Sequence, residues 1–98
     1  MKLGSVDLVV RGSMKQFRVK DQELLVVNFE GQFFCFDARC THAGAPLVEG
    51  SLDGVVLTCP WHGSQFRVTD GTVLRGPAGR ALKSYVVEVR DGVVFVEF

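Results

Sequence analysis

The chain has 98 residues, with 11 basic and 11 acidic side chains and a formal net charge of zero. This length is that of a single domain, and the charge balance argues against nucleic acid as a partner, because nucleic-acid-binding proteins usually carry a clustered basic excess. The strongest apolar runs are four residues long, far short of the roughly 20 residues of a membrane helix. We therefore expect no contact with a membrane.

The N-terminal segment contains Asp7 and Arg11 and lacks the apolar core of a secretory signal. The chain has three cysteines, an odd number, whereas small secreted domains held by disulfides usually have an even set. We therefore expect a cytoplasmic protein whose cysteines bind a metal.

Short segments of alternating apolar and polar residues predict an all-β chain, and no long stretch keeps the apolar period of a helix. Acid–Gly pairs predict four hairpin turns, because glycine accepts the positive φ of a tight turn; the pairs are Glu30–Gly31, Asp53–Gly54, Asp70–Gly71 and Asp91–Gly92. The predicted strands lie near residues 5–10, 15–20, 23–29, 32–37, 55–58, 65–68, 82–90 and 93–98. Two segments with Gly and Pro, 38–50 and 74–80, are predicted to be ordered loops.

Several residues in the predicted strands are expected to be structural. Cys35 lies in the apolar run from Phe33 to Phe36, where we expect it to pack as a small hydrophobe and not to bind a metal. The aromatic residues of the alternating segments are expected in the core, with no cofactor role: Phe17, Phe29, Tyr85, Phe95 and Phe98.

The most specific pattern consists of two Cys–His pairs. Cys40-Thr41-His42 is followed, after 16 residues, by Cys59-Pro60-Trp61-His62. A thiolate and an imidazole two or three positions apart can point to the same side of a tight turn, and two such turns that face each other form a four-ligand metal site. The glycines and prolines beside both pairs suit a backbone that bends closely around an inorganic core.

Together, Cys40-x-His42 and Cys59-x-x-His62 resemble the Rieske motif, in which two Cys bind one iron of a [2Fe–2S] cluster and two His bind the other. Gly63 and Ser64 after the second pair, Phe66 beyond them, and Gly76-Pro77-Ala78 also fall where similar proteins place such residues.

The resemblance extends from about Val26 to the C-terminus. It implies the Rieske fold of three stacked antiparallel sheets, in one domain over residues 1–98 with residues 38–79 as the cluster-binding part. It also implies that Ser64 donates a hydrogen bond to the cluster or to a cysteine sulfur.

Other interpretations of the four residues fit the spacing less well. Structural zinc usually uses Cys-x2-4-Cys or His-x3-5-His pairs, whereas each pair here mixes one Cys with one His. A Cys–His catalytic dyad would leave the second pair unexplained. Unrelated core cysteines and surface histidines rarely coincide at such spacing.

Two residues separate the possible subfamilies. Respiratory Rieske proteins have additional cysteines at the positions of Ala45 and Trp61, so the disulfide that braces their loops is not possible here. The chain resembles instead the Rieske ferredoxins of aromatic-ring-hydroxylating dioxygenase systems. The Rieske-like small subunit of a larger reductase, such as nitrite reductase, is the alternative.

The resemblance implies a one-electron carrier and not an enzyme. Its expected partners are a flavin-containing reductase, which gives the electron, and a terminal oxygenase, which receives it. High-potential relatives have a Tyr hydroxyl at the position of Phe66, so we expect a potential in the lower part of the Rieske range.

The sequence allows two interpretations for each of two surface features. Trp61 lies between two predicted ligands, and we expect it to fold over the loop as a lid in preference to standing exposed as a partner contact. Residues 67–83 contain four bases and one acid, which is compatible with a basic docking rim or with an ordinary solvated surface.

Overall fold

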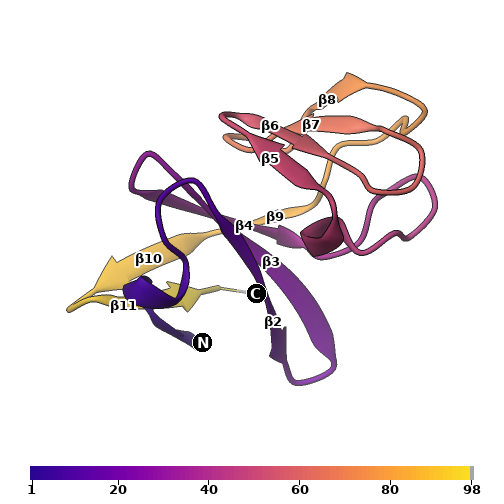
Figure 1. Ribbon diagram of the computed structural model, residues 1–98. Coiled ribbons are helices and arrows are strands. Elements are labelled where there is room, and N and C mark those ends of the chain that lie inside the picture. Colours follow the sequence, from indigo (N-terminus) through magenta and orange to yellow (C-terminus); the bar gives the residue numbers. More distant parts are fainter. Residues whose placement is uncertain (98) are drawn as a thin grey trace.

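The computed structural model describes residues 1–97 and consists mainly of three antiparallel sheets (Figure 1). Sheet 1 has the order β1-β11-β10, from strands Lys2–Ser5, Val93–Val96 and Val87–Arg90. Sheet 2 has the order β2-β3-β4-β9, from strands Met14–Val19, Gln22–Phe29, Gln32–Asp37 and Ser84–Tyr85. Sheet 3 has the order β5-β6-β7-β8, from strands Ser51–Asp53, Val56–Thr58, Gln65–Arg67 and Val73–Arg75. Short 3-10 helices η1 and η2 span Val6–Leu8 and Leu47–Glu49.

The all-β class and the three antiparallel sheets predicted from the sequence are therefore confirmed. Each of the four acid–Gly pairs lies at the connection between two paired strands, as predicted, with Asp53 as the last residue of β5. At Glu30–Gly31 both residues have positive φ, 53° and 89°, the combination that a type I′ hairpin turn requires. No helix among residues 1–97 is long and apolar enough to cross a membrane.

The prediction of a strand at residues 5–10 is wrong. β1 ends at Ser5, whose hydroxyl accepts a hydrogen bond from the N–H of Asp7 at 3.1 Å and caps η1. A serine hydroxyl that accepts a hydrogen bond from the backbone N–H two residues later competes with strand pairing. The apolar residues that follow Ser5 give no sign of this hydrogen bond in the sequence.

The strand predicted at 82–90 is interrupted at Val86. β9 pairs with β4 of sheet 2, whereas β10 pairs with β11 of sheet 1, so the chain changes sheets at this residue. Two further strands, β5 and β8, were not predicted, and β8 extends into the loop predicted at 74–80. Both strands have three residues, too few to show an alternating pattern.

Sheet 2 is covered on both faces. Leu25 and Val27 of β3 belong to the larger core cluster, which extends to sheet 3, whereas Leu24 and Val26 belong to a smaller cluster with Val96 of sheet 1. Successive residues of a strand point to opposite faces, so a strand between two cores needs a continuous apolar run. This explains why the residues from Leu24 to Val27 are apolar without interruption.

Cys35 is 1% exposed in the smaller cluster, which confirms its structural role. The predicted core aromatics Phe17, Phe29 and Tyr85 are partly buried against the two clusters. Phe95 does not join either cluster, because its half-buried ring lies under the guanidinium of Arg90, 4.4 Å from the ring centroid. Phe98, and with it the end of the strand predicted at 93–98, lies outside the described residues.

Gly50 connects η2 to β5 at a point of close backbone contact. A Cβ atom at this residue would lie 2.0 Å from the carbonyl oxygen of Thr58, the residue that precedes Cys59. We predict that Gly50→Ala lowers the free energy of unfolding by at least about 2 kcal/mol, because overpacking against rigid atoms typically costs about 1–3 kcal/mol. Urea denaturation followed by circular dichroism measures this change.

Gly79→Ala is the matched control. Among the described residues no heavy atom lies within 4 Å of the Cβ position at Gly79. The free energy of unfolding of this variant should stay within about 0.5 kcal/mol of the parent value. Equal stability of the two alanine variants would contradict the close approach at Gly50.

Candidate metal centre

The four predicted ligands lie in two loops that close in the same way. The N–H of Cys40 donates to the carbonyl oxygen of Ala45 at 2.9 Å, and the N–H of Cys59 donates to the carbonyl oxygen of Ser64 at 2.8 Å. In each loop the bond joins the cysteine to the fifth residue after it. The two loops, residues 40–45 and 59–64, are therefore equivalent backbone turns.

A glycine occupies the same position in both turns. Gly44 and Gly63 are each four residues after the cysteine, with φ of 73° and 75°. An L-residue with a side chain rarely adopts this left-handed conformation, so glycine is required for the backbone to return to the cysteine. The histidine is the third residue of the first loop and the fourth residue of the second.

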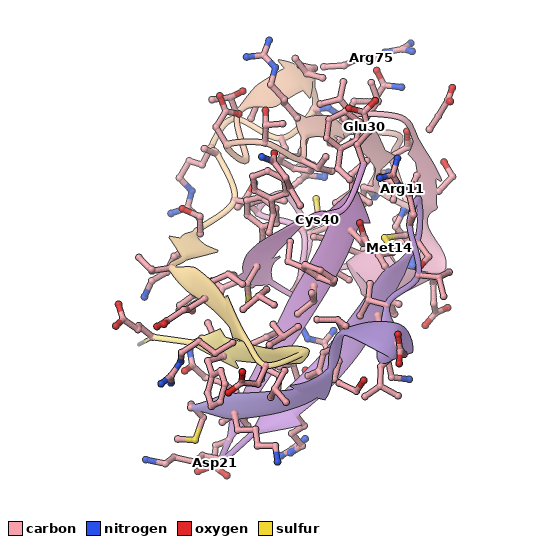
Figure 2. All side chains as sticks on the ribbon, turned by 90° about the vertical axis from the view of Figure 1, so that its left-hand side faces the viewer. Arg11, Met14, Asp21, Glu30, Cys40 and Arg75 are labelled. Carbon is pink, nitrogen blue, oxygen red and sulfur yellow. The ribbon has the colours of Figure 1, made fainter. Side chains whose placement is uncertain are left out.

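The two cysteines point inward and are neighbours. Cys40 and Cys59 are 4% and 3% exposed, and both belong to the larger core cluster. Burial raises the pKa of the Cys40 thiol, and the neighbouring Cys59 raises it further, while N–H groups of His42 and Ala43 lower it. Cys40 lies in the interior of the molecule in Figure 2.

The two histidines lie at the surface, side by side. His42 and His62 are exposed, their ring centroids are 5.0 Å apart, and the ring planes make an angle of 84°. The structure therefore pairs the two predicted cysteines as buried thiols and the two predicted histidines as exposed imidazoles.

This donor set fits a [2Fe–2S] centre of the Rieske type. Thiolate and imidazole donors occur as two matched pairs, one for each iron of such a centre. Among the described residues no three His, Cys, Asp or Glu side chains form a group that could hold one metal ion. A Rieske centre does not need such a group, because each of its irons takes only two protein ligands.

A third loop, residues 76–80, connects to both ligand loops. The hydroxyl of Thr41 donates to the carbonyl oxygen of Arg80 at 2.7 Å. The N–H of Ala78 donates to the hydroxyl oxygen of Ser64 at 2.9 Å, and Ser64 is fully buried. The hydroxyl proton of Ser64 is therefore directed elsewhere, because the oxygen acts as the acceptor in this bond. In Figure 1 the three loops meet at the right-hand edge of the molecule.

Arg39 attaches the first ligand loop to sheet 2. Its guanidinium donates to the carbonyl oxygen of Gly44 at 2.9 Å and forms an ion pair with Glu23 of β3 at 3.2 Å. Arg39, Glu23 and Thr41 were not among the site residues predicted from the sequence. No motif marks them, because the packing of the loops against sheet 2 and the third loop decides which side chains meet.

Trp61 does not form a lid, contrary to the prediction. Its side chain is 57% exposed, and Pro60 and His62 on either side are exposed as well. The hydrogen bond that closes the loop turns Cys59 inward, and the residues at the tip of the turn consequently point to solvent.

Cys35 takes no part in the site. It belongs to the smaller core cluster, on the opposite face of sheet 2 from the larger cluster that contains Cys40 and Cys59. Burial, with a smaller contribution from the charge of Asp37, raises the pKa of the Cys35 thiol to about 12. The thiol stays protonated at neutral pH.

Comparison with known proteins gives consistent matches over most of the chain. The family model of the Rieske [2Fe-2S] domain matches residues 1–86. Ferredoxin CarAc of Metapseudomonas resinovorans is 40% identical over 79 residues, which are 81% of this chain and 74% of that protein.

Solved structures agree with these matches. The Sphingomonas yanoikuyae B1 ferredoxin has a TM-score of 0.94 and 31% identity, over 100% of this chain and 97% of that one. A chain from a complex of reduced oxygenase and oxidized ferredoxin in carbazole 1,9a-dioxygenase has a TM-score of 0.90 and 35% identity, over 98% and 90% of the two chains. The chain described here belongs to the Rieske [2Fe–2S] family and is an electron-carrying ferredoxin with one Rieske-type cluster.

Proposed function

We propose that Cys40 and Cys59 bind one iron of the cluster, that His42 and His62 bind the other, and that Ser64 donates a hydrogen bond to the sulfur-rich side. When bound, the cluster accepts and returns one electron. Residues 38–79, which include both ligand loops and sheet 3, form the cluster-binding part of a single domain over residues 1–98.

The observation that carries this proposal is the asymmetry of the donor pairs. The cysteine sulfurs are buried in the core, whereas the two imidazoles lie at the surface with their rings 5.0 Å apart. A partner protein can therefore approach the iron held by the histidines and not the iron held by the cysteines. The exposed imidazole edges are the contact through which the electron enters and leaves.

The proposed partners are a flavin-containing reductase as donor and the terminal oxygenase of a dioxygenase system as acceptor. A similar ferredoxin, 35% identical, occurs in a solved complex with an oxygenase of carbazole 1,9a-dioxygenase. A cytoplasmic location belongs to the proposal, because the three cysteines are unpaired and the cytoplasm keeps thiols reduced.

The ligand set favours reduction of the cluster. Two thiolates and two neutral imidazoles give an oxidised centre a formal charge of roughly zero, compared with about −2 for four thiolates. The chain has Phe66 where high-potential relatives have a Tyr hydroxyl, so a potential in the lower part of the Rieske range, about −150 to +300 mV, is expected.

We predict that Cys40→Ser or Cys59→Ser abolishes cluster binding, because thiolate ligands anchor iron–sulfur centres. EPR of the reduced protein, with iron and sulfide analysis, measures the cluster content. Cys35→Ser is the matched control: it replaces a thiol that is equally buried but lies in the other core cluster, and it should retain full iron and sulfide content. Unchanged iron in Cys40→Ser, or loss of iron in Cys35→Ser alone, would contradict the assignment.

We predict that Ser64→Ala lowers the reduction potential, because the variant loses a hydrogen-bond donor that stabilises the reduced cluster. It should also lower the free energy of unfolding by about 1–3 kcal/mol, since the buried N–H of Ala78 loses its acceptor. Protein-film voltammetry and urea denaturation measure the two effects. Ser51→Ala, at an exposed position of the same sheet, is the control and should change neither quantity.

Phe66→Tyr adds a hydrogen-bond donor near the cysteines, whereas Ser64→Ala removes one. Phe66 is fully buried on β7, in the core cluster that contains Cys40 and Cys59. We predict a higher potential when the added hydroxyl donates to a cysteine sulfur. An unchanged potential in a variant whose crystal structure shows that bond would exclude hydrogen bonding as the controlling factor.

A further inference from the structure

The charges of this chain are unevenly distributed although they sum to zero. Residues 67–83 contain four cations, Arg67, Arg75, Arg80 and Lys83, and one anion, Asp70. This segment therefore has a net charge of +3, and the rest of the chain has a net charge of −3.

Three of the four cations remain without a carboxylate partner. Arg67 pairs with Asp70 at 3.5 Å. Arg75, Arg80 and Lys83 are exposed and take part in none of the ion pairs found among residues 1–97, although the ammonium of Lys83 also lies 5.3 Å from the centroid of the Tyr85 ring. We name these three residues the basic strip.

Two residues of the basic strip, Arg75 and Arg80, lie next to the ligand loops. Arg75 of β8 pairs in register with Gln65, the residue after Ser64 at the end of the second loop. The carbonyl oxygen of Arg80 accepts the hydrogen bond from Thr41, the residue before His42. Figure 2 shows Arg75 at the upper end of the molecule, with its side chain extended away from the body and Asp21 at the lower end.

An exposed aromatic ring lies in the second ligand loop. Trp61 precedes His62 and is 57% exposed, whereas most of the other large apolar side chains are buried or half-buried. Exposed tryptophans and arginines are typical anchors of protein interfaces. The surface around the ligand loops thus combines an apolar anchor with Arg75 and Arg80, which take part in none of the ion pairs found among residues 1–97.

We propose that the basic strip and Trp61 form a docking face for an acidic protein surface, with carboxylates opposite the strip and an apolar recess for the indole. This proposal rests on the electron-carrier function and specifies the chemistry of the partner. Complementary charge accelerates encounter and orients the two proteins. Arg75 and Arg80 next to the ligand loops would orient this molecule of zero net charge so that the loops face a carboxylate-rich surface. Three cations are few for a nucleic acid, whose binding proteins commonly make about six or more phosphate contacts.

The experiment measures the sign of the electrostatic potential at the protein surface through which the electron passes to an oxidant. The reduced, cluster-loaded protein gives one electron to hexacyanoferrate(III), an anionic oxidant, or to hexaamminecobalt(III), a cationic oxidant. With hexacyanoferrate(III) the rate of electron transfer should fall about tenfold between low and high salt. A tenfold change is at the lower end of the rate enhancements that electrostatic steering produces. With hexaamminecobalt(III) the rate should rise with salt or stay constant.

The triple variant Arg75→Gln, Arg80→Gln, Lys83→Gln should lose most of the salt dependence with hexacyanoferrate(III). The matched control is Lys2→Gln, Arg11→Gln, Arg90→Gln, which changes the net charge equally at exposed positions in β1 and β10 and beside the β3–β4 turn. It should keep the parent salt dependence. Equal responses of the two triple variants, or a rate with hexacyanoferrate(III) that rises with salt, would overturn the basic docking face.

Failure of the underlying function is measured separately. EPR and the visible spectrum report the cluster in each variant before the rates are measured. A parent protein without a [2Fe–2S] signal would refute the electron-carrier proposal itself. A normal signal with unchanged salt dependence in the Arg75, Arg80 and Lys83 variant would refute only the docking face.

Discussion

The backbone hydrogen bonds from Cys40 to Ala45 and from Cys59 to Ser64 determine the arrangement of the site. Each bond closes a six-residue turn that places a cysteine in the core and a histidine at the surface. Burial raises the pKa of Cys40, whereas iron would bind this side chain as a thiolate. Binding of iron by Cys40 would therefore be coupled to loss of the thiol proton.

The two turns are held by side chains from three different parts of the chain. Arg39 connects the first turn to Glu23 of sheet 2, and the loop after β8 is bonded to Thr41 in the first turn and to Ser64 in the second. Groups that are fixed before an electron arrives need little rearrangement when the charge changes. The hydrogen bonds around the turns would thus serve electron transfer as well as stability, a double role that fits a buried serine two residues after the second histidine.

The sequence predicted the parts of this structure that depend on local patterns. The Cys–His spacing predicted two matching loops, and the acid–Gly pairs located four hairpins. The change of sheet at Val86 could not be predicted, because apolar residues continue on both sides of it and only the pairing partners differ. The exposure of Trp61 likewise depends on the backbone bond that closes its loop. Arg39 and Glu23 are 16 residues apart, so only the packed structure shows that they meet.

An electron carrier takes up an electron from one partner and delivers it to another. Both steps limit how strongly the basic strip can attract a partner. Reduction of the proposed cluster would add one negative charge on the side of the basic strip, so an acidic surface would attract the reduced form less than the oxidised form. This difference would help the protein leave the proposed reductase after it takes up an electron, but it would oppose release from the proposed oxygenase after the electron has been delivered. A large positive patch would therefore slow one of the two steps. Three exposed cations in a chain of zero net charge can orient an encounter without holding either partner for long.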